Sequence, residues 1–159
     1  MLEHRVLLVR PARASAVQVI DDGDSGAPLG FVRRVAAAPP SWWPSFGRPI
    51  LAVHEHEDEP LLFTIRRAWS LLPRREVCDA DGSPVGSLLG RFVQDRHGRT
   101  LAALQGNNGG GSFRSPTHHT LAEWTATAEG MRIEFGPEII GEPFVKMLLL
   151  AAALEIGRP

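Results

Sequence analysis

Cysteine and lysine are almost absent from this chain of 159 residues, which has one of each, Cys78 and Lys146. A single cysteine cannot form an internal disulfide, and a cysteine-rich zinc site needs several. A phosphate-binding loop of the P-loop type needs lysine directly after glycine, whereas Lys146 follows Val145. These scarcities exclude a disulfide scaffold and a P-loop nucleotide site, and Schiff-base chemistry would depend on one residue.

Signals for secretion and membrane insertion are also missing. The apolar run at residues 6–9 is too short for a signal peptide, and no Asn-x-Ser/Thr sequon occurs. No apolar segment reaches the roughly twenty residues that a transmembrane helix requires. We therefore expect a cytoplasmic protein without a transmembrane segment, and peripheral contact with a membrane remains open.

The overall composition is that of an ordinary folded domain. Hydrophobic residues make up 43% and charged residues 22%, and the net charge is −1. A protein that binds nucleic acid through bulk positive charge would be much more basic. We expect residues 1–159 to form one domain, and the 16 glycines and 13 prolines favour many turns between short strands.

An internal echo organises residues 19–101 of the chain. Gly26, Pro28 and Gly30 recur at the same spacing as Gly82, Pro84 and Gly86, each after a short apolar run and an aspartate. Residues 92–101 repeat the pattern of strand, Asp-x-x-Gly and strand without the proline. Aspartate and glycine suit the turn, and proline opens a strand where no amide donor is needed. The echo predicts a meander of β-hairpins in one closed or nearly closed sheet.

Alternating and apolar runs place the remaining strands. Residues 106–112, rich in glycine and asparagine, predict a flexible surface loop, and residues 39–44, broken by prolines, predict a connection. The acidic stretch 54–60 predicts a hairpin loop. The expected strands cover residues 5–10, 16–20, 29–35, 50–54, 61–66, 75–79, 85–93, 99–104, 121–127 and 131–135.

The C-terminal segment changes character. Residues 143–156 are rich in Leu, Met and Ala, which favour a helix that begins at Pro143 and stops before Gly157. This helix, about 21 Å long, is apolar nearly all round, so it needs protein on every side. An all-β chain that ends in such a helix predicts a wide barrel with the helix in its lumen.

The order of these features resembles the tubby C-terminal-like superfamily, in its phospholipid-scramblase and LURP-one-related branch. The resemblance rests on the strand at residues 61–67, the strand and turn at 77–82, the continuation at 84–88 and the helix at 145–156. It spans most of residues 16–156 and implies a closed antiparallel barrel of about twelve strands around a central hydrophobic helix. The chain is short for this family, so one or two strands are expected to be vestigial.

Enzymatic chemistry finds little support in the sequence. His54 and His56 would share one face of a strand, near Glu59, as in a cupin-like metalloenzyme, but no further histidine follows Gly86 at the spacing a cupin needs. Residues 79–82 resemble the start of an EF-hand loop but lack its glutamate at the twelfth position. Cys78 is expected to be a small buried residue. We expect no catalytic residue, no cofactor and no metal; the His54 and His56 site is the weakest of the hypotheses.

Arginine is the remaining candidate for binding. Arg66 and Arg67 precede the segment 68–73, which contains Trp69, and Arg74 and Arg75 follow it. If the two strands pair, the four guanidinium groups gather at one rim of the barrel, where they suit a lipid phosphate or another anion. Basic residues on barrel strands bind phosphoinositide headgroups in some tubby-like proteins. The alternative is that Glu76, Asp79 and Asp81 neutralise them in weak surface pairs.

Besides the cupin-like metalloenzyme with His54 and His56, two functional hypotheses follow. The first is a non-enzymatic scramblase-like or tubby-like binding module for an anionic lipid or phosphorylated ligand, with Arg66, Arg67, Arg74 and Arg75 as ligand-binding residues. The second is a structural or protein-interaction domain that uses the loops at residues 39–46 and 106–120. Trp42 and Trp43 in the first loop suit a partner protein, a membrane interface or a plug of one barrel end.

Overall fold

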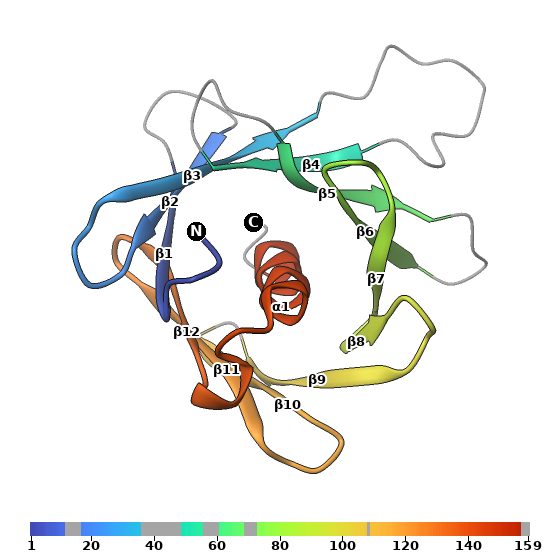
Figure 1. Cartoon of the computed structure of the whole chain (residues 1–159). Coiled ribbons are helices and arrows are strands. Elements are labelled where there is room, and N and C mark those ends of the chain that lie inside the picture. Colours follow the sequence, from blue (N-terminus) through green and yellow to red (C-terminus); the bar gives the residue numbers. More distant parts are fainter. Residues whose placement is uncertain (12–16, 36–48, 56–60, 69–72, 108, 157–159) are drawn as a thin grey trace.

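A computed structural model describes residues 1–11, 17–35, 49–55, 61–68, 73–107 and 109–156 (Figure 1). Within these ranges the chain forms twelve strands, a 3-10 helix η1 (Pro137–Ile139) and a helix α1 (Pro143–Ile156). The strands are β1 (Val6–Pro11), β2 (Val17–Asp22), β3 (Pro28–Arg34), β4 (Pro49–His54), β5 (Leu61–Arg67), β6 (Arg74–Asp79), β7 (Pro84–Leu89), β8 (Phe92–Asp95), β9 (Thr100–Asn107), β10 (Gly110–Arg114), β11 (Thr120–Thr127) and β12 (Gly130–Phe135).

The twelve strands form a closed antiparallel barrel. Each strand pairs with its neighbours in sequence, and β1 pairs with β12, so the described sheet has no open edge. Along β12 the buried residues Met131, Ile133 and Phe135 alternate with half-buried Arg132 and Glu134, as expected for a wall with an apolar inner face. The predicted twelve-stranded barrel is confirmed, and the expectation of vestigial strands is wrong.

Aspartate builds the hairpin turns that the echo predicted. Between β6 and β7, Asp79 Oδ1 accepts hydrogen bonds from the backbone N–H groups of Asp81 at 3.1 Å and Ser83 at 2.8 Å, and Gly82 supplies a φ of 80°. Between β8 and β9, Asp95 Oδ1 accepts from two backbone N–H groups in the same way. These hydrogen bonds favour the charged carboxylate and lower the pKa of Asp95.

The prediction of one strand over residues 85–93 is wrong. The chain reverses at Gly90 and Arg91, which separate β7 from β8, and the two strands pair with each other through Leu88 and Val93. Gly90 has a φ of 57°, a left-handed conformation that glycine adopts without steric cost. The turn has only two residues, and apolar residues lie on both sides of it, so the segment resembled one continuous strand.

The prediction of a flexible loop over the glycine-rich residues 106–112 is also wrong, because most of this run belongs to two strands. Strand β9 extends to Asn107, and β10 begins at Gly110. Gly111 lies opposite Trp124 of β11, which is 4% exposed, and a Cβ at Gly111 would lie 2.9 Å from Trp124 Nε1. The indole therefore occupies the space beside the glycine strand, and the absence of a side chain there is a packing requirement.

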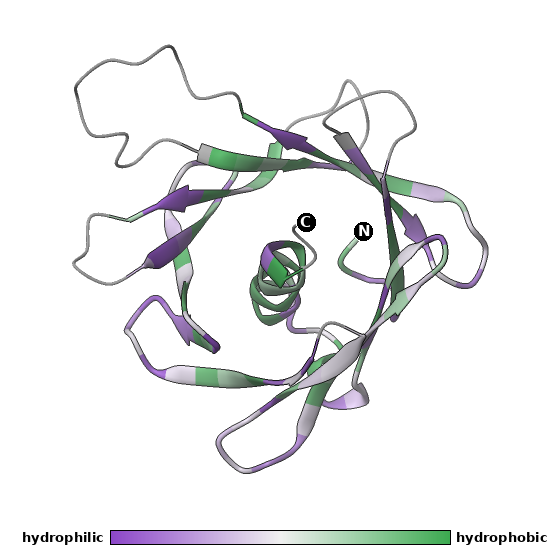
Figure 2. Ribbon diagram, turned by 180° about the vertical axis from the view of Figure 1, so that it is seen from behind, coloured by the Kyte–Doolittle hydropathy of each residue, from purple (hydrophilic) through white to green (hydrophobic). Residues whose placement is uncertain are grey.

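Helix α1 lies in the lumen of the barrel, with strands around it (Figure 1). Its bounds agree with the prediction, and residues 146–154 are all buried. Most of the helix is hydrophobic (Figure 2), and its two charged residues, Lys146 and Glu155, belong to its first and last turns. Leu149, Leu150, Ala151 and Ala153 have no exposed surface at all, as a helix without a polar face requires.

The helix lies closest to β7, where Gly86 faces Leu148. A Cβ at Gly86 would come within 2.9 Å of both Leu148 methyl carbons and would collide with the backbone carbonyl oxygen of Gln94 on β8. Glycine at this position therefore sets the distance between the helix and the barrel wall.

The first residues of the chain fill the lumen on another side of the helix (Figure 1). Met1 and Leu2 pack against the core, and the backbone carbonyl oxygen of His4 accepts a hydrogen bond from Lys146 Nζ at 3.3 Å. Lys146 is 3% exposed, and its ammonium lies 5.4 Å from the centre of the Phe135 ring. Burial lowers the pKa of this lysine, because it penalises the charged form.

We predict that Gly86→Ala destabilises the fold. The added methyl group meets a backbone oxygen that cannot move away without disturbing the β7–β8 pair, and overpacking of this kind costs about 1–3 kcal/mol. Urea denaturation monitored by tryptophan fluorescence measures the change. The matched control is Gly109→Ala, whose new methyl group would meet only Asn107 Oδ1, at an ordinary contact distance of 3.5 Å. Equal midpoints for the two variants would contradict the proposed close packing.

Replacement of the buried lysine should stabilise the protein at neutral pH. Lys146→Met keeps an unbranched side chain that is one atom shorter and removes a buried charge, which we expect to add about 1 kcal/mol to the free energy of unfolding. Because the folded-state pKa of Lys146 is lowered, the unfolded chain binds more protons, and wild-type stability rises as pH approaches 10.5. The difference between variant and wild type should therefore narrow between pH 7 and pH 10.5, as measured by chemical denaturation; a gap that widens would contradict the charge penalty.

Candidate functional site

The structure places all four arginines singled out by the sequence at one end of the β5–β6 pair: Arg66, Arg67, Arg74 and Arg75. In this pair Arg67 lies opposite Arg75, and Arg66 lies opposite Glu76. Side chains alternate along a strand, so Arg67 and Arg75 share the inner face with the buried Ile65 and Val77. Arg66 and Arg74 belong to the outer face. The four residues therefore share one rim but are divided between its two sides, and Trp69 lies outside the described residues.

On the outer face, Arg66 is neutralised by its cross-strand neighbour. Its Nε donates a hydrogen bond to Glu76 Oε2 at 2.8 Å, which raises the pKa of Arg66 above its ordinary value. Arg74 differs, because its buried Nε has no hydrogen-bond partner among the residues that the structure describes. Cys78, in the same outward row, is fully buried, and this burial raises the pKa of its thiol. The prediction of a buried cysteine is confirmed.

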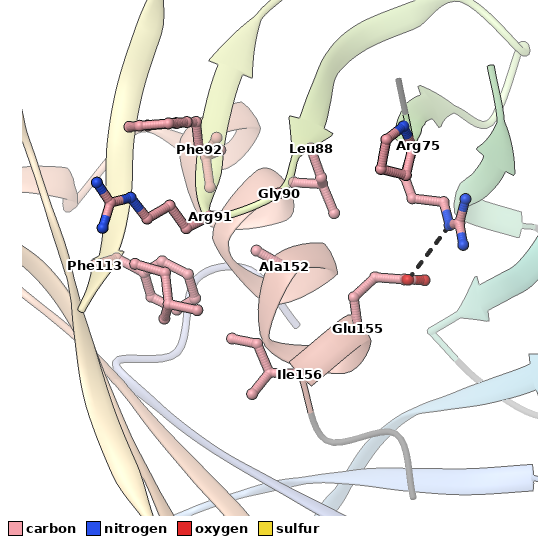
Figure 3. A pocket seen from close by; sticks show the side chains of 12 residues that line it. Arg75, Leu88, Gly90, Arg91, Phe92, Phe113, Ala152, Glu155 and Ile156 are labelled. Carbon is pink, nitrogen blue, oxygen red and sulfur yellow. Dashed lines mark ion pairs between the residues drawn. The ribbon is translucent and has the colours of Figure 1, made fainter. Parts of the chain in front are cut away.

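On the inner face, a pocket of about 250 Å³ opens at the end of the lumen where α1 finishes (Figure 3). Strands β6 to β10 and the last turn of α1 surround it. Arg75 and Glu155 lie on one side of it and Arg91 on the other, while apolar side chains cover the surface between them. This arrangement joins a hydrocarbon surface to charged groups at its edge.

Arg75 and Glu155 form the ion pair at the edge of the pocket. Arg75 Nε lies 3.5 Å from Glu155 Oε2, and both side chains are largely buried, with exposures of 23% and 18%. The pair attracts electrostatically, but within the described residues Arg75 Nε has no hydrogen-bond partner. A guanidinium carries five N–H donors in a planar fork, so Arg75 retains capacity for a further anion.

Arg91 is the second cation at the pocket. Its guanidinium carbon lies 5.3 Å from the centre of the Phe92 ring, a cation–π distance that orders an otherwise exposed side chain. Sequence reasoning missed this residue, because residues 85–93 resembled one strand. The dipeptide of Gly90 and Arg91 between two apolar runs was the available signal, since it marks the hairpin turn.

The charges at this rim do not balance. Arg67, Arg75 and Arg91 carry three positive charges, and Glu155 is the acidic residue that lines the pocket. Like charges directly opposite each other on paired strands are destabilising, and Arg67 opposite Arg75 is such a pair. In the described part of the chain, no ion pair neutralises Arg67 or Arg91. The rim therefore favours an anion.

The other candidates from the sequence do not gather into a site. His54 ends β4, whereas His56 and Glu59 lie outside the described ranges. In the described ranges, no group of three or more His, Cys, Asp or Glu residues is arranged to hold a metal ion. His119 is engaged with Glu138, whose Oε1 lies 2.8 Å from its Nδ1. The turn at residues 79–82 is a hairpin, as its hydrogen bonds show.

A second cavity, of about 430 Å³, lies at the opposite end of the lumen, beside the first turn of α1. Asp79, Asp95 and Phe144 are among its lining residues. Both aspartates already accept backbone hydrogen bonds in their turns. Their charge is therefore committed to local structure, and this end offers a poorer anion site than the rim with the arginines.

The comparisons with known proteins show the fold. No protein-family model matches the chain, and no curated protein matches it in sequence. Its structure is similar to the crystal structure of the Arabidopsis thaliana protein AT5G01750, with a TM-score of 0.57 and 12% sequence identity. The similarity covers 92% of this chain and 91% of the other. In addition, none of the helices in the described ranges is long and apolar enough to cross a membrane.

The burial of Cys78 leads to a test of the outer face. Since the thiolate is the reactive form and burial raises the pKa of this thiol, we expect labelling by a disulfide reagent at pH 8 to be at least about tenfold slower in the native protein than in guanidinium chloride. The rate is measured by spectrophotometry, from the absorbance of the thiol that the reagent releases. Rapid stoichiometric labelling of the native protein would show that the wall beneath Arg66 and Glu76 is open.

Proposed function

We propose that this protein is a non-enzymatic binding module for an anionic ligand, either a lipid headgroup or a phosphorylated molecule, as in the scramblase-like and tubby-like group that its sequence resembles. The observation that supports this proposal is the unbalanced charge at the rim. Arg75 and Arg91 line a pocket that contains one carboxylate, Glu155, and Arg67 lies opposite Arg75 on the neighbouring strand. The site needs no catalytic residue, because its chemistry is recognition of charge.

Arginine suits this role for geometric reasons. Its planar fork forms paired, charge-assisted hydrogen bonds with carboxylate and phosphate oxygens. Arg67 and Arg75 are adjacent across the β5–β6 pair, so an anion between them would relieve the repulsion of the two like charges. Ligand binding would in this way stabilise the rim as well as occupy it.

The rim charge predicts binding to anionic membranes. We expect the protein to float with vesicles that contain phosphatidylcholine together with either phosphatidylserine or a phosphoinositide. With vesicles of phosphatidylcholine alone, the protein should remain in the bottom fraction of the gradient. Arg67→Ala/Arg91→Ala should weaken this binding roughly tenfold or more, because each arginine near an anionic surface contributes about 1 kcal/mol. Soluble inositol trisphosphate is the second arm: binding to it without flotation would identify a free phosphorylated ligand.

Two double variants control for the loss of charge. Arg96→Ala/Arg99→Ala removes two exposed arginines at the β8–β9 turn, next to the opposite cavity, and should leave binding unchanged. Arg66→Ala/Arg74→Ala removes the outward pair and should retain most of the binding, since Glu76 already neutralises Arg66. Equal recovery with neutral and anionic vesicles and no binding of inositol trisphosphate would refute the proposed function.

A further inference from the structure

The surface of the pocket beneath the arginines is apolar. Side chains from the wall and from the last turn of α1 converge there, and those that form the hydrocarbon surface are Leu88, Val93, Leu104, Phe113, Ala152 and Ile156. In the close view, Phe113 of the wall and Ala152 of the helix form part of this apolar surface, which we call the floor of the pocket (Figure 3). A site for a hydrophilic phosphate alone would not need this surface, because it gains nothing from contact with a headgroup.

The size of the pocket limits what it can hold. Its volume of about 250 Å³ is below the range of roughly 300–1,000 Å³ that is typical of pockets for drug-sized ligands. A single hydrocarbon chain of moderate length fits this volume, whereas the two chains of a membrane phospholipid do not. The helix excludes deeper penetration, because residues 146–154 already fill the lumen.

The positions of the charges match the head of such a molecule. Arg75 and Arg91 lie on opposite sides of the pocket, at its edge, and the apolar floor lies between them (Figure 3). Arg75 Nε is buried and makes no hydrogen bond within the described residues, although it lies 3.5 Å from Glu155. An anionic group at the end of a chain would give this donor a partner while the chain covers the floor.

From this combination we infer that the pocket binds a single-chain anionic amphiphile, with its alkyl chain against the last turn of α1 and its carboxylate or phosphate head between Arg75 and Arg91. This inference rests on the proposed function, since it uses the same rim, and it adds the class of ligand. Glu155 sets the affinity: its carboxylate shares Arg75 with the incoming head and opposes it by like-charge repulsion.

Calorimetric titration of the full chain with two probes, decanoate and decyl phosphate below their micellar concentrations, tests the inference. We expect one molecule per chain for at least one of them, and at least tenfold weaker binding of decanol, which lacks the charge. Affinity should rise roughly fourfold for each added methylene between hexanoate and octanoate, in proportion to the apolar surface buried. Binding of neither probe, or equal binding of decanol, would overturn the inference.

Separate variants test the binding sites of the anionic head and of the alkyl chain of the ligand. Arg75→Gln should lower the affinity at least tenfold, and Glu155→Gln should raise it severalfold, because it removes the competing charge. Ala152→Leu fills the floor and should abolish binding of the chain, whereas the control Ala128→Leu, in the exposed turn after β11, should bind like the wild type. If Ala152→Leu proves unfolded by circular dichroism, Ile156→Trp at the open end of the pocket replaces it.

The titration with alkyl probes and the flotation with anionic vesicles can fail independently, so the amphiphile site and the proposed function are tested separately. Flotation with anionic vesicles depends on the arginines at the rim and should persist in Ala152→Leu, because headgroup contact does not need the floor. Anionic vesicle binding without binding of either alkyl probe would leave the proposed function intact and refute the amphiphile site. Tight decanoate binding that is unchanged in Ala152→Leu would place the alkyl chain of the probe elsewhere, and it would also refute the amphiphile site.

Discussion

A helix without a polar face is unstable in water, and α1 is such a helix. Nine consecutive residues, 146–154, are buried, and four of them have no exposed surface. Because the apolar surface runs around the whole circumference, a single sheet packed on one side would leave half of it in water. The closed wall of twelve strands meets this requirement on every side. The architecture of the described residues thus follows from the burial of helix α1.

The barrel and the helix fit together through small residues at defined positions. Gly86 admits Leu148 where the helix lies nearest to the wall, and Gly111 leaves room for the Trp124 indole within β10 and β11. On another side of the helix, the first residues of the chain fill the lumen. There the backbone carbonyl oxygen of His4 accepts a hydrogen bond from the buried Lys146. Close packing inside the barrel therefore depends on where side chains are absent as much as on where they are present.

Local chemistry made most of the fold predictable, and long-range pairing limited the rest. The hairpins followed from Asp-x-x-Gly turns, since a carboxylate that accepts neighbouring backbone N–H groups acts within four residues. The strand at Gly110 was missed, because its stability depends on Trp124, which is distant in the sequence and invisible to local patterns. The arginines were placed at the correct rim. Their division between two faces was already implied by the alternation of Arg66 and Arg67 along one strand.

A filled lumen also determines where a ligand can bind. In a barrel whose interior is occupied by its own helix, free apolar surface remains where an end of the helix lies inside the wall, and the pocket beside Glu155 and Ile156 is such a place. Charged residues are tolerated there because the rim meets water, whereas Ile65 and Val77, one step deeper on the same face, are fully buried. The apolar floor lies next to the arginines because the helix ends inside the barrel at this rim. The carboxylate of Glu155 partly offsets their positive charge.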